Sequence, residues 1–181
     1  EAPYIVFQKL VVKENLVSGD FLGYVNGTDP DIYTTTDLDF SIDSVTSGST
    51  GDYSVVNTFL RLSAELYLDE DDVLDYETTP FINLTFDVQD NEDLTGTGIV
   101  QLTLIDQNDP PRFTCPLTGF YCDTIYINET QPDGSGVTNF SVTDQDGDDT
   151  IFYMGSSSNA YMKNRFAIRK QTGELIVSLT G

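Results

Sequence analysis

Alternation of apolar and polar residues is the feature that most limits the fold of this chain. In residues 81–89, four apolar residues occupy every second position, and residues 100–104 repeat the pattern (Ile82, Leu84, Phe86, Val88; Val100, Leu102, Leu104). Successive side chains of a strand point to opposite faces, so this period predicts half-buried strands. Shorter alternations predict further strands at Ile125/Ile127, Phe166/Ile168 and Leu175/Val177/Leu179. No long helical pattern occurs, and the sequence therefore predicts an all-β protein of sandwich type.

Turn residues separate the predicted strands. Glycine follows a small or polar residue at each of these points: Ser18-Gly19-Asp20, Asn26-Gly27, Ser47-Gly48, Asp133-Gly134, Asp146-Gly147 and Thr172-Gly173. Such pairs favour tight turns because glycine adopts positive φ angles without steric cost.

The charge of the chain limits its chemistry. Thirty Asp and Glu residues face eight Lys and Arg residues, which gives a net charge of −22, and the sequence contains no His. Without His, the chain lacks Ser-His-Asp and Cys-His catalysis and His-liganded zinc. The negative charge repels phosphate backbones, so nucleic acid is not expected as a partner. Carboxylate oxygens are the hard ligands that Ca²⁺ prefers.

Two patterns indicate a secreted chain. Asn-X-Ser/Thr sequons occur at Asn26, Asn83, Asn128 and Asn139, and Asn83 lies on the polar side of its predicted strand. Cys115 and Cys122 are predicted to form a disulfide that closes a small loop, and two reduced thiols are the alternative. No run approaches the length of about 20 apolar residues that a membrane span needs.

The chain repeats itself with a constant offset. Glu14, Gly19 and the Asp29-Pro30-Asp31 segment recur 115 residues later as Glu129, Gly134 and Asp144-Gln145-Asp146. A shared offset in separate motifs predicts tandem modules. Pro110-Pro111 forms a stiff connection, so we place the modules at residues 1–109 and 110–181.

Acidic residues alternate at three places, namely Asp75-Tyr76-Glu77, Asp106–Asp109 and Asp144-Gln145-Asp146. In an extended segment, alternate residues point the same way, so each pair offers two carboxylates to one ion. Without a cation, these carboxylates would repel one another.

Carboxylate pairs also serve glycosidases, but these pairs imply no cleft, and we predict that the chain is not an enzyme. The run Asp69–Asp72 is interpreted as a solvated loop.

These motifs resemble the cadherin superfamily in order and spacing. Glu14 is followed by Leu74-Asp75-Tyr76-Glu77, by the linker Asp106-Gln107-Asn108-Asp109-Pro110-Pro111-Arg112-Phe113, and by Asp144-Gln145-Asp146. The resemblance implies tandem Greek-key β-sandwich repeats with up to three Ca²⁺ ions at their junction. It implies backbone carbonyl ligands from Gln107 and Pro110. It also implies side-chain ligands from the first repeat (Glu14, Asp75, Glu77), from the linker (Asp106, Asn108, Asp109) and from the second repeat (Asp144, Asp146).

The chain departs from the family at two points. Pro110 replaces the last Asn of the linker but keeps its carbonyl oxygen. The chain ends at Gly181, before the counterpart of Asp90 in the second repeat, which should weaken the outermost ion site. The resemblance also implies metal ligands for outer junctions at Asp29, Asp31, Asp90 and Glu129. We therefore expect a fragment of a longer array with a truncated second repeat, although Gly181 could instead be a cleavage point.

The function expected from the resemblance is that of an adhesion-receptor ectodomain outside the cell. Ca²⁺ would stiffen the joint between repeats, so that the array can support homophilic or heterophilic adhesion with a cadherin or other protein in cis or trans. The alternative is a structural spacer, or docking repeats of a long cadherin that bind a different protein. The unusual Ser/Thr/Gly-rich segment at residues 44–51 is either partner-specific or merely tolerated. No membrane contact by this segment is expected.

Overall fold

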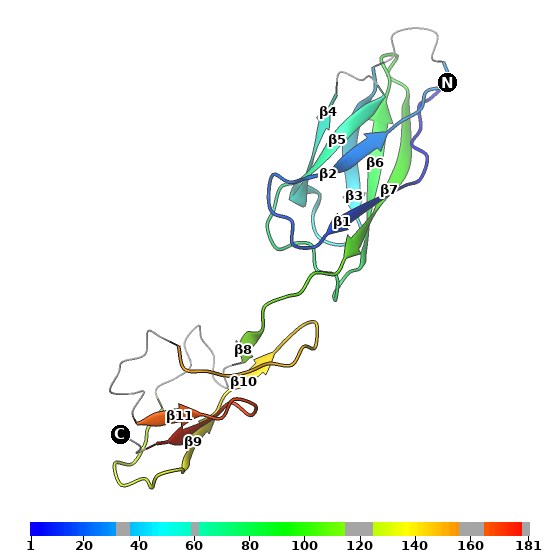
Figure 1. Cartoon of the computed structure of the whole chain (residues 1–181). Coiled ribbons are helices and arrows are strands. Elements are labelled where there is room, and N and C mark those ends of the chain that lie inside the picture. Colours follow the sequence, from blue (N-terminus) through cyan, green and yellow to red (C-terminus); the bar gives the residue numbers. More distant parts are fainter. Residues whose placement is uncertain (32–36, 59–61, 115–124, 156–164, 179–181) are drawn as a thin grey trace. The chain divides into compact units, whose positions relative to one another are not determined.

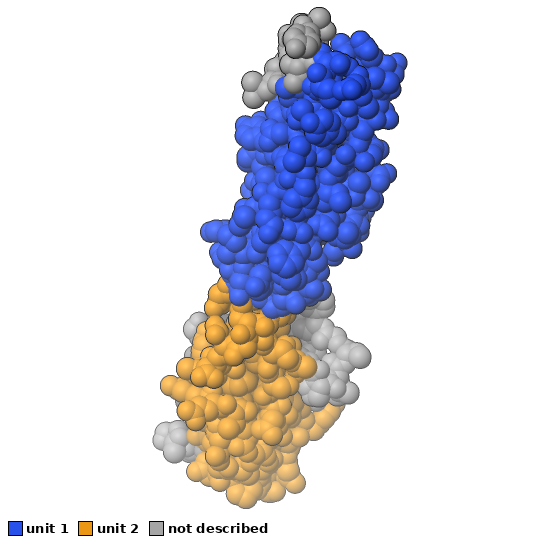
Figure 2. Space-filling model, turned by 90° about the vertical axis from the view of Figure 1, so that its right-hand side faces the viewer, with its two compact units in different colours: residues 1–107 blue, residues 108–181 orange. Residues whose placement is uncertain are grey.

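The computed structural model describes residues 1–31, 37–58, 62–114, 125–155 and 165–178. The chain folds into two compact units, Glu1–Gln107 and Asn108–Gly181, which are shown in different colours in Figure 2. The division falls two residues before the boundary that we place from the sequence. Each unit is described by itself.

The first unit contains two facing sheets (Figure 1). One sheet has the order β1-β7-β6-β3, in which β1 runs parallel to β7 and the other pairs are antiparallel. The second sheet has the order β2-β5-β4, and both of its pairs are antiparallel. The bounds are β1 Gln8–Lys13, β2 Phe21–Asn26, β3 Asp39–Val45, β4 Tyr53–Asn57, β5 Ser63–Leu68, β6 Phe81–Gln89 and β7 Thr95–Ile105, with a 3₁₀ turn η1 at Thr50–Asp52.

The core of this unit consists of the side chains that point between the sheets. All the apolar residues predicted to face inward in β6 and β7 are buried, and Leu66 and Leu68 of β5 are fully buried opposite them. Polar residues of the same strands, such as Asn83 and Thr85, are only half-buried. This alternation confirms the predicted sandwich and fixes which face of each strand reaches solvent.

Most of the predicted glycine turns are present. Five of the six predicted turn glycines have positive φ angles, between 68° and 91° (Gly19, Gly48, Gly134, Gly147 and Gly173). The turn predicted at Asn26-Gly27 is wrong. The chain continues there beside residue 62, because the Gly27 N–H donates to the Leu62 carbonyl at 2.8 Å. Gly27 is needed for space, since a Cβ atom would lie 2.8 Å from Leu38 and 3.0 Å from Phe40.

The second unit repeats part of the first. Its three-stranded sheet has the order β11-β12-β9, and β8 pairs with β10. The Gly134 N–H donates to the last residue of β12, Val177, as the Gly19 N–H donates to the last residue of β5, Leu68. The sheet β9-β12-β11 therefore corresponds to β2-β5-β4 of the first unit. The bounds are β8 Arg112–Thr114, β9 Gly136–Asn139, β10 Ser141–Thr143, β11 Phe166–Ile168 and β12 Glu174–Val177.

Some predicted strands differ from the structure. Ile125 and Ile127 are 40% and 46% exposed and pair with no strand among the described residues, so the strand predicted there is wrong. The other two short strands are present as β11 and β12, and Leu179 lies outside the described residues. Within the described part of the chain, no helix has the length and apolar character that a membrane crossing requires.

Candidate metal centre

Glu14 is a buried carboxylate at the end of β1. Its side chain is only 6% exposed, and it follows the last residue of the strand. One carboxylate oxygen accepts the N–H of Tyr76 at 2.6 Å, and the other accepts the N–H of Gln107 at 2.5 Å. Glu14 therefore holds the loop after β5 and the segment after β7 against the end of β1. A carboxylate can accept about four hydrogen bonds or ligand contacts, so both oxygens keep capacity for a cation.

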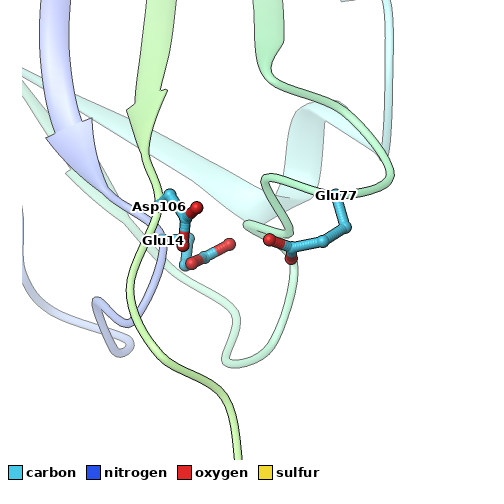
Figure 3. A group of neighbouring side chains, drawn as sticks. All are labelled: Glu14, Glu77 and Asp106. Carbon is cyan, nitrogen blue, oxygen red and sulfur yellow. The ribbon is translucent and has the colours of Figure 1, made fainter. Parts of the chain in front are cut away.

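Two further carboxylates meet Glu14 at this end of the first unit. Glu77 comes from the loop between β5 and β6, and Asp106 directly follows β7. One oxygen from each of the three side chains lies within 4.8 Å of the other two. Figure 3 shows the carboxylates converging on one space from three separate elements. Glu77 and Asp106 are exposed, so the group opens to solvent while Glu14 forms its buried side.

The chemistry of this group fits a hard divalent cation. All donors are carboxylate oxygens, which Ca²⁺ prefers, and none is a soft sulfur or imidazole donor. Three like charges at this separation repel one another, and a divalent cation converts that repulsion into attraction. The structure therefore brings together three of the predicted metal ligands that lie far apart in the sequence. It is also the only such group of three among the described His, Cys, Asp and Glu side chains.

The Asp75 side chain is held by hydrogen bonds from Thr78. Its carboxylate accepts both the N–H and the hydroxyl of Thr78, at 2.9 Å and 3.0 Å. The Thr79 N–H donates to the Asp75 carbonyl at 2.8 Å, so this segment forms a turn. The extended geometry predicted for Asp75-Tyr76-Glu77 is wrong, because side-chain and backbone hydrogen bonds favour the turn locally.

The predicted ligands of the second unit lie around a second turn. The Gly147 N–H donates to the Asp144 carbonyl, and the Asp148 N–H donates to the Asp144 carboxylate. The extended geometry predicted for Asp144-Gln145-Asp146 is therefore also wrong. The Asp146 carboxylate accepts the N–H of Asp109 at 2.6 Å, which ties the start of this unit to the turn. Asn108 donates its side-chain amide to the Asp109 carbonyl, and Pro110 is exposed.

The carboxylates predicted for outer junctions differ in their surroundings. Asp29 is 2% exposed and accepts the N–H of Asp31, while the Asp31 carboxylate contacts the ammonium group of Glu1. This contact raises the pKa of that ammonium group. Asp90 is 8% exposed and accepts the N–H groups of Glu92 and Leu94 in the β6–β7 turn. Glu129 is exposed in the second unit.

The predicted covalent sites remain predictions. Cys115 and Cys122 lie outside the described residues. Asn26 and Asn83 are the sequons of the first unit, and each side chain contacts a neighbouring glutamine, Gln8 and Gln101 respectively. Asn128 accepts from Thr130, and Asn139 ends β9.

Sequence reasoning missed the backbone donors around Glu14. Tyr76 was not predicted to contact the site, and Gln107 was predicted to act through its carbonyl rather than its N–H. The available signal was the alternation of β1, which places Glu14 two positions after the buried Val12 and therefore on the inward side.

Solved structures show which proteins share this fold. Solved extracellular cadherin domains have the same fold, which confirms the resemblance predicted from the sequence. Human Protocadherin-24 EC1-2 aligns with a TM-score of 0.56 and 20% identity, over 99% of this chain and 78% of that chain. Protocadherin Gamma B7 extracellular cadherin domains 1-4 align with a TM-score of 0.53 and 17% identity, over 98% of this chain and 41% of that chain.

A sequence relative gives more specific information. The chain is 34% identical over 109 residues to the mouse and human proteins named Cadherin EGF LAG seven-pass G-type receptor 2. The match covers 59% of this chain and 4% of those receptors. No model of a protein family matches the chain. The solved structures are named as extracellular cadherin domains, and the chain spans only a small part of the length of the receptors that it matches.

Proposed function

We propose that the chain is a non-enzymatic, Ca²⁺-binding segment of an adhesion-receptor ectodomain. The observation that carries the proposal is the convergence of Glu14, Glu77 and Asp106 from three separate elements. A bound Ca²⁺ would link these elements and neutralise their charges. The resemblance assigns further ligands to the linker and to Asp144 and Asp146, and on this basis Ca²⁺ would stiffen the joint between repeats. Adhesion to a cadherin or another protein is what the resemblance to cadherins implies.

Thermal unfolding with and without 2 mM Ca²⁺ tests the metal site. Extracellular Ca²⁺ modules bind in the range of about 10⁻⁴–10⁻³ M, so each ion should add about 0.5–2 kcal/mol at this concentration. We expect the melting temperature of the native chain to rise by several degrees. The rise should shrink by more than half in Glu77→Gln and in Asp106→Asn, whose side chains are exposed and whose loss leaves the core intact.

Glu70→Gln is the matched control, because it removes one exposed carboxylate from the loop that we interpret as solvated. Its response to Ca²⁺ should equal that of the native chain. A site at Glu77 and Asp106 is refuted if all of these chains respond to Ca²⁺ alike, or if none responds. Isothermal titration of the same variants then gives the affinity directly.

A further inference from the structure

Three aromatic side chains meet on the outer face of the sheet formed by β2, β5 and β4 (Figure 1). Phe21 of β2 lies opposite Tyr67 of β5, and their ring centres are 5.5 Å apart. The ring centre of Tyr24 lies 5.1 Å from that of Phe21, and both contacts are edge-to-face. Phe21 and Tyr24 are each 46% exposed, so the rings meet at the surface and not in the core. We call Phe21, Tyr24 and Tyr67 the aromatic cluster.

A carboxylate lies beside the aromatic cluster. Glu65 of β5 pairs with Tyr24 in the register, and its carboxylate accepts the hydroxyl of Tyr67 at 2.7 Å. On its other side Glu65 pairs with Val56 of β4, which is 50% exposed. Within the described part of this sheet, no residue is basic. The Glu65 carboxylate therefore has exposed apolar and aromatic neighbours but no cation of its own sheet.

The second unit supplies that cation from its own chain. β12 pairs with β11 in the same register as β5 pairs with β4, which places Glu174 at the position of Glu65 and Arg169 at the position of Val56. The Arg169 N–H donates to the Glu174 carbonyl at 2.9 Å, and the Arg169 Nε lies 2.8 Å from the Glu174 carboxylate. One unit thus pairs this glutamate with a guanidinium, and the other places an exposed valine there.

The aromatic cluster is also specific to the first unit. The corresponding positions of the second unit follow from the register and hold no aromatic residue (Gly136 for Phe21, Asn139 for Tyr24, Ile176 for Tyr67). Cross-strand aromatic pairs stabilise a sheet by about 0.2–1 kcal/mol each. The second unit forms its sheet without them, so the fold alone does not account for three rings on this face.

We propose that the aromatic cluster and Glu65 bind an arginine-bearing segment of another protein. A guanidinium stacks on aromatic faces and donates paired hydrogen bonds to a carboxylate, so it matches both parts of the face. It would take the place that Arg169 holds beside Glu174 in the second unit. The inference concerns the first unit alone and goes beyond calcium binding.

The charge around the face favours a basic partner. Asp20 precedes β2 and residues 69–72, all acidic, follow β5, at the end of the sheet where Phe21 pairs with Tyr67. Residues 1–107 contain 21 acidic and three basic residues. Such a field attracts a cationic segment and speeds its encounter with the face. A second copy of the chain carries the same negative charge and fits this face poorly.

A peptide titration followed by NMR tests the proposal. The probe is the acetylated and amidated pentapeptide Gly-Arg-Gly-Arg-Gly, added to the ¹⁵N-labelled full chain at 2 mM Ca²⁺. The chain carries no N-glycans, because the Asn26 sequon lies two residues after Tyr24. We expect saturable shifts of the amide signals of Tyr24, Glu65 and Tyr67. The same peptide with lysine in place of arginine should bind about threefold more weakly or less, since an ammonium group offers no planar fork or stacking face.

Val56→Arg provides the sharpest variant. It places an internal guanidinium opposite Glu65, as Arg169 lies opposite Glu174, and should weaken peptide binding about fivefold or more because the carboxylate is then occupied. Val11→Arg is the matched control, since it makes the same change at a 61% exposed valine on β1 of the other sheet. It should bind the peptide within about twofold of the native chain, because distant charges are screened.

Glu65→Gln removes the carboxylate and adds no side chain. It should also weaken binding about fivefold or more, whereas Glu70→Gln, which removes an exposed carboxylate outside the aromatic cluster, should not. Thermal unfolding at the same Ca²⁺ concentration checks that each variant is folded.

The proposal is overturned if the arginine peptide causes no saturable shifts at the aromatic cluster, if the lysine peptide binds equally well, or if each variant binds as its control does. It is also overturned if the signals of the cluster move when the chain alone is diluted, because a second copy would then be the occupant. Since Ca²⁺ is constant throughout, these outcomes leave the test of the carboxylate group of Glu14, Glu77 and Asp106 unaffected.

Discussion

Glu14 contributes both to the fold of the first unit and to its proposed metal site. A buried carboxylate is costly unless hydrogen bonds or an opposite charge compensate it. Two backbone N–H groups supply part of this compensation, and they come from segments that also carry the exposed carboxylates of Glu77 and Asp106. The residue that positions the loops therefore also forms the inner wall of the proposed metal site.

Tyr53 predicts how the stability of the chain depends on alkaline pH. It begins β4 and is buried, and this burial, together with the charge of Asp52, raises its pKa from 10.0 to about 12. Below pH 10 the phenol is neutral in both states. Between pH 10 and 12 the unfolded chain loses the proton while the folded chain keeps it, so the free energy of unfolding falls as pH rises. The loss should be about 1.4 kcal/mol at pH 11.

Urea unfolding at pH 8 and pH 11 measures this loss. In Tyr53→Phe the phenol is absent, so the difference between the two pH values should be smaller than in the native chain by about the same 1.4 kcal/mol. Tyr126→Phe, which changes a 91% exposed tyrosine, is the control. An identical pH dependence in native and Tyr53→Phe chains would contradict the assignment.

At the scale of single residues, the sequence predicted which acidic residues come together better than it predicted the backbone geometry around them. The order of Glu14, Glu77 and Asp106 identified three acids that the fold brings together. The extended pairs around Asp75 and Asp144 were wrong because hydrogen bonds from Thr78 and Asp148 fold these segments into turns. Competition between a side chain and the backbone for the same N–H groups is local, and residue alternation does not reveal it.

At the scale of elements, periodicity predicted the long strands but did not predict the burial of the N-terminal segment that packs on them. The alternation in β6 and β7 is regular because one face packs on the core along the whole strand. The segment before β1 has no such period, yet Pro3 and Ile5 are buried. Tyr4 forms a bridge with Thr28, which anchors this segment beside the second sheet. Its burial depends on the other elements and could not be predicted from its own residues.

Two glycines of β7 make room for this segment. A Cβ atom at Gly98 would lie 2.4 Å from the Ile5 Cβ and 2.5 Å from the Ile5 carbonyl oxygen, and one at Gly96 would lie 1.8 Å from the Pro3 carbonyl oxygen. Gly98→Ala should therefore displace the segment and lower the free energy of unfolding by about 1–3 kcal/mol. Urea unfolding measures the loss, and faster hydrogen exchange at the Tyr4 N–H, which donates to Thr28, should accompany it.

The matched control is Gly51→Ala, since the nearest atom to its Cβ would lie 3.6 Å away, at an ordinary contact distance. This change should be nearly neutral. If Gly98→Ala were as mild as Gly51→Ala, the packing of the N-terminal segment on β7 would be refuted.

At the scale of the whole molecule, the internal repeat could be detected in the sequence because several motifs recur with the same offset. Gly19 and Gly134 occupy corresponding turns, and each donates to the end of the central strand of a three-stranded sheet. Glu14 and Glu129 share the offset but not the surroundings, since one is buried and the other exposed. The repeat in sequence therefore predicts topology more reliably than it predicts the state of each carboxylate.

Calcium should change how the two units move relative to each other. If ions are shared by ligands of both units and the linker, as we propose, their binding removes the independent motion that a short linker otherwise permits. Backbone ¹⁵N relaxation measures the rotational correlation time of each unit separately. Without Ca²⁺ the smaller unit, Asn108–Gly181, should tumble faster than Glu1–Gln107, and with 2 mM Ca²⁺ both should share one longer correlation time. Asp109→Ala removes a predicted linker ligand and should keep the two values apart at the same Ca²⁺ concentration, whereas Glu70→Gln should behave as the native chain does. Two values that stay different in the Ca²⁺-saturated native chain would show that the ions do not stiffen the joint, even if the carboxylate group binds them.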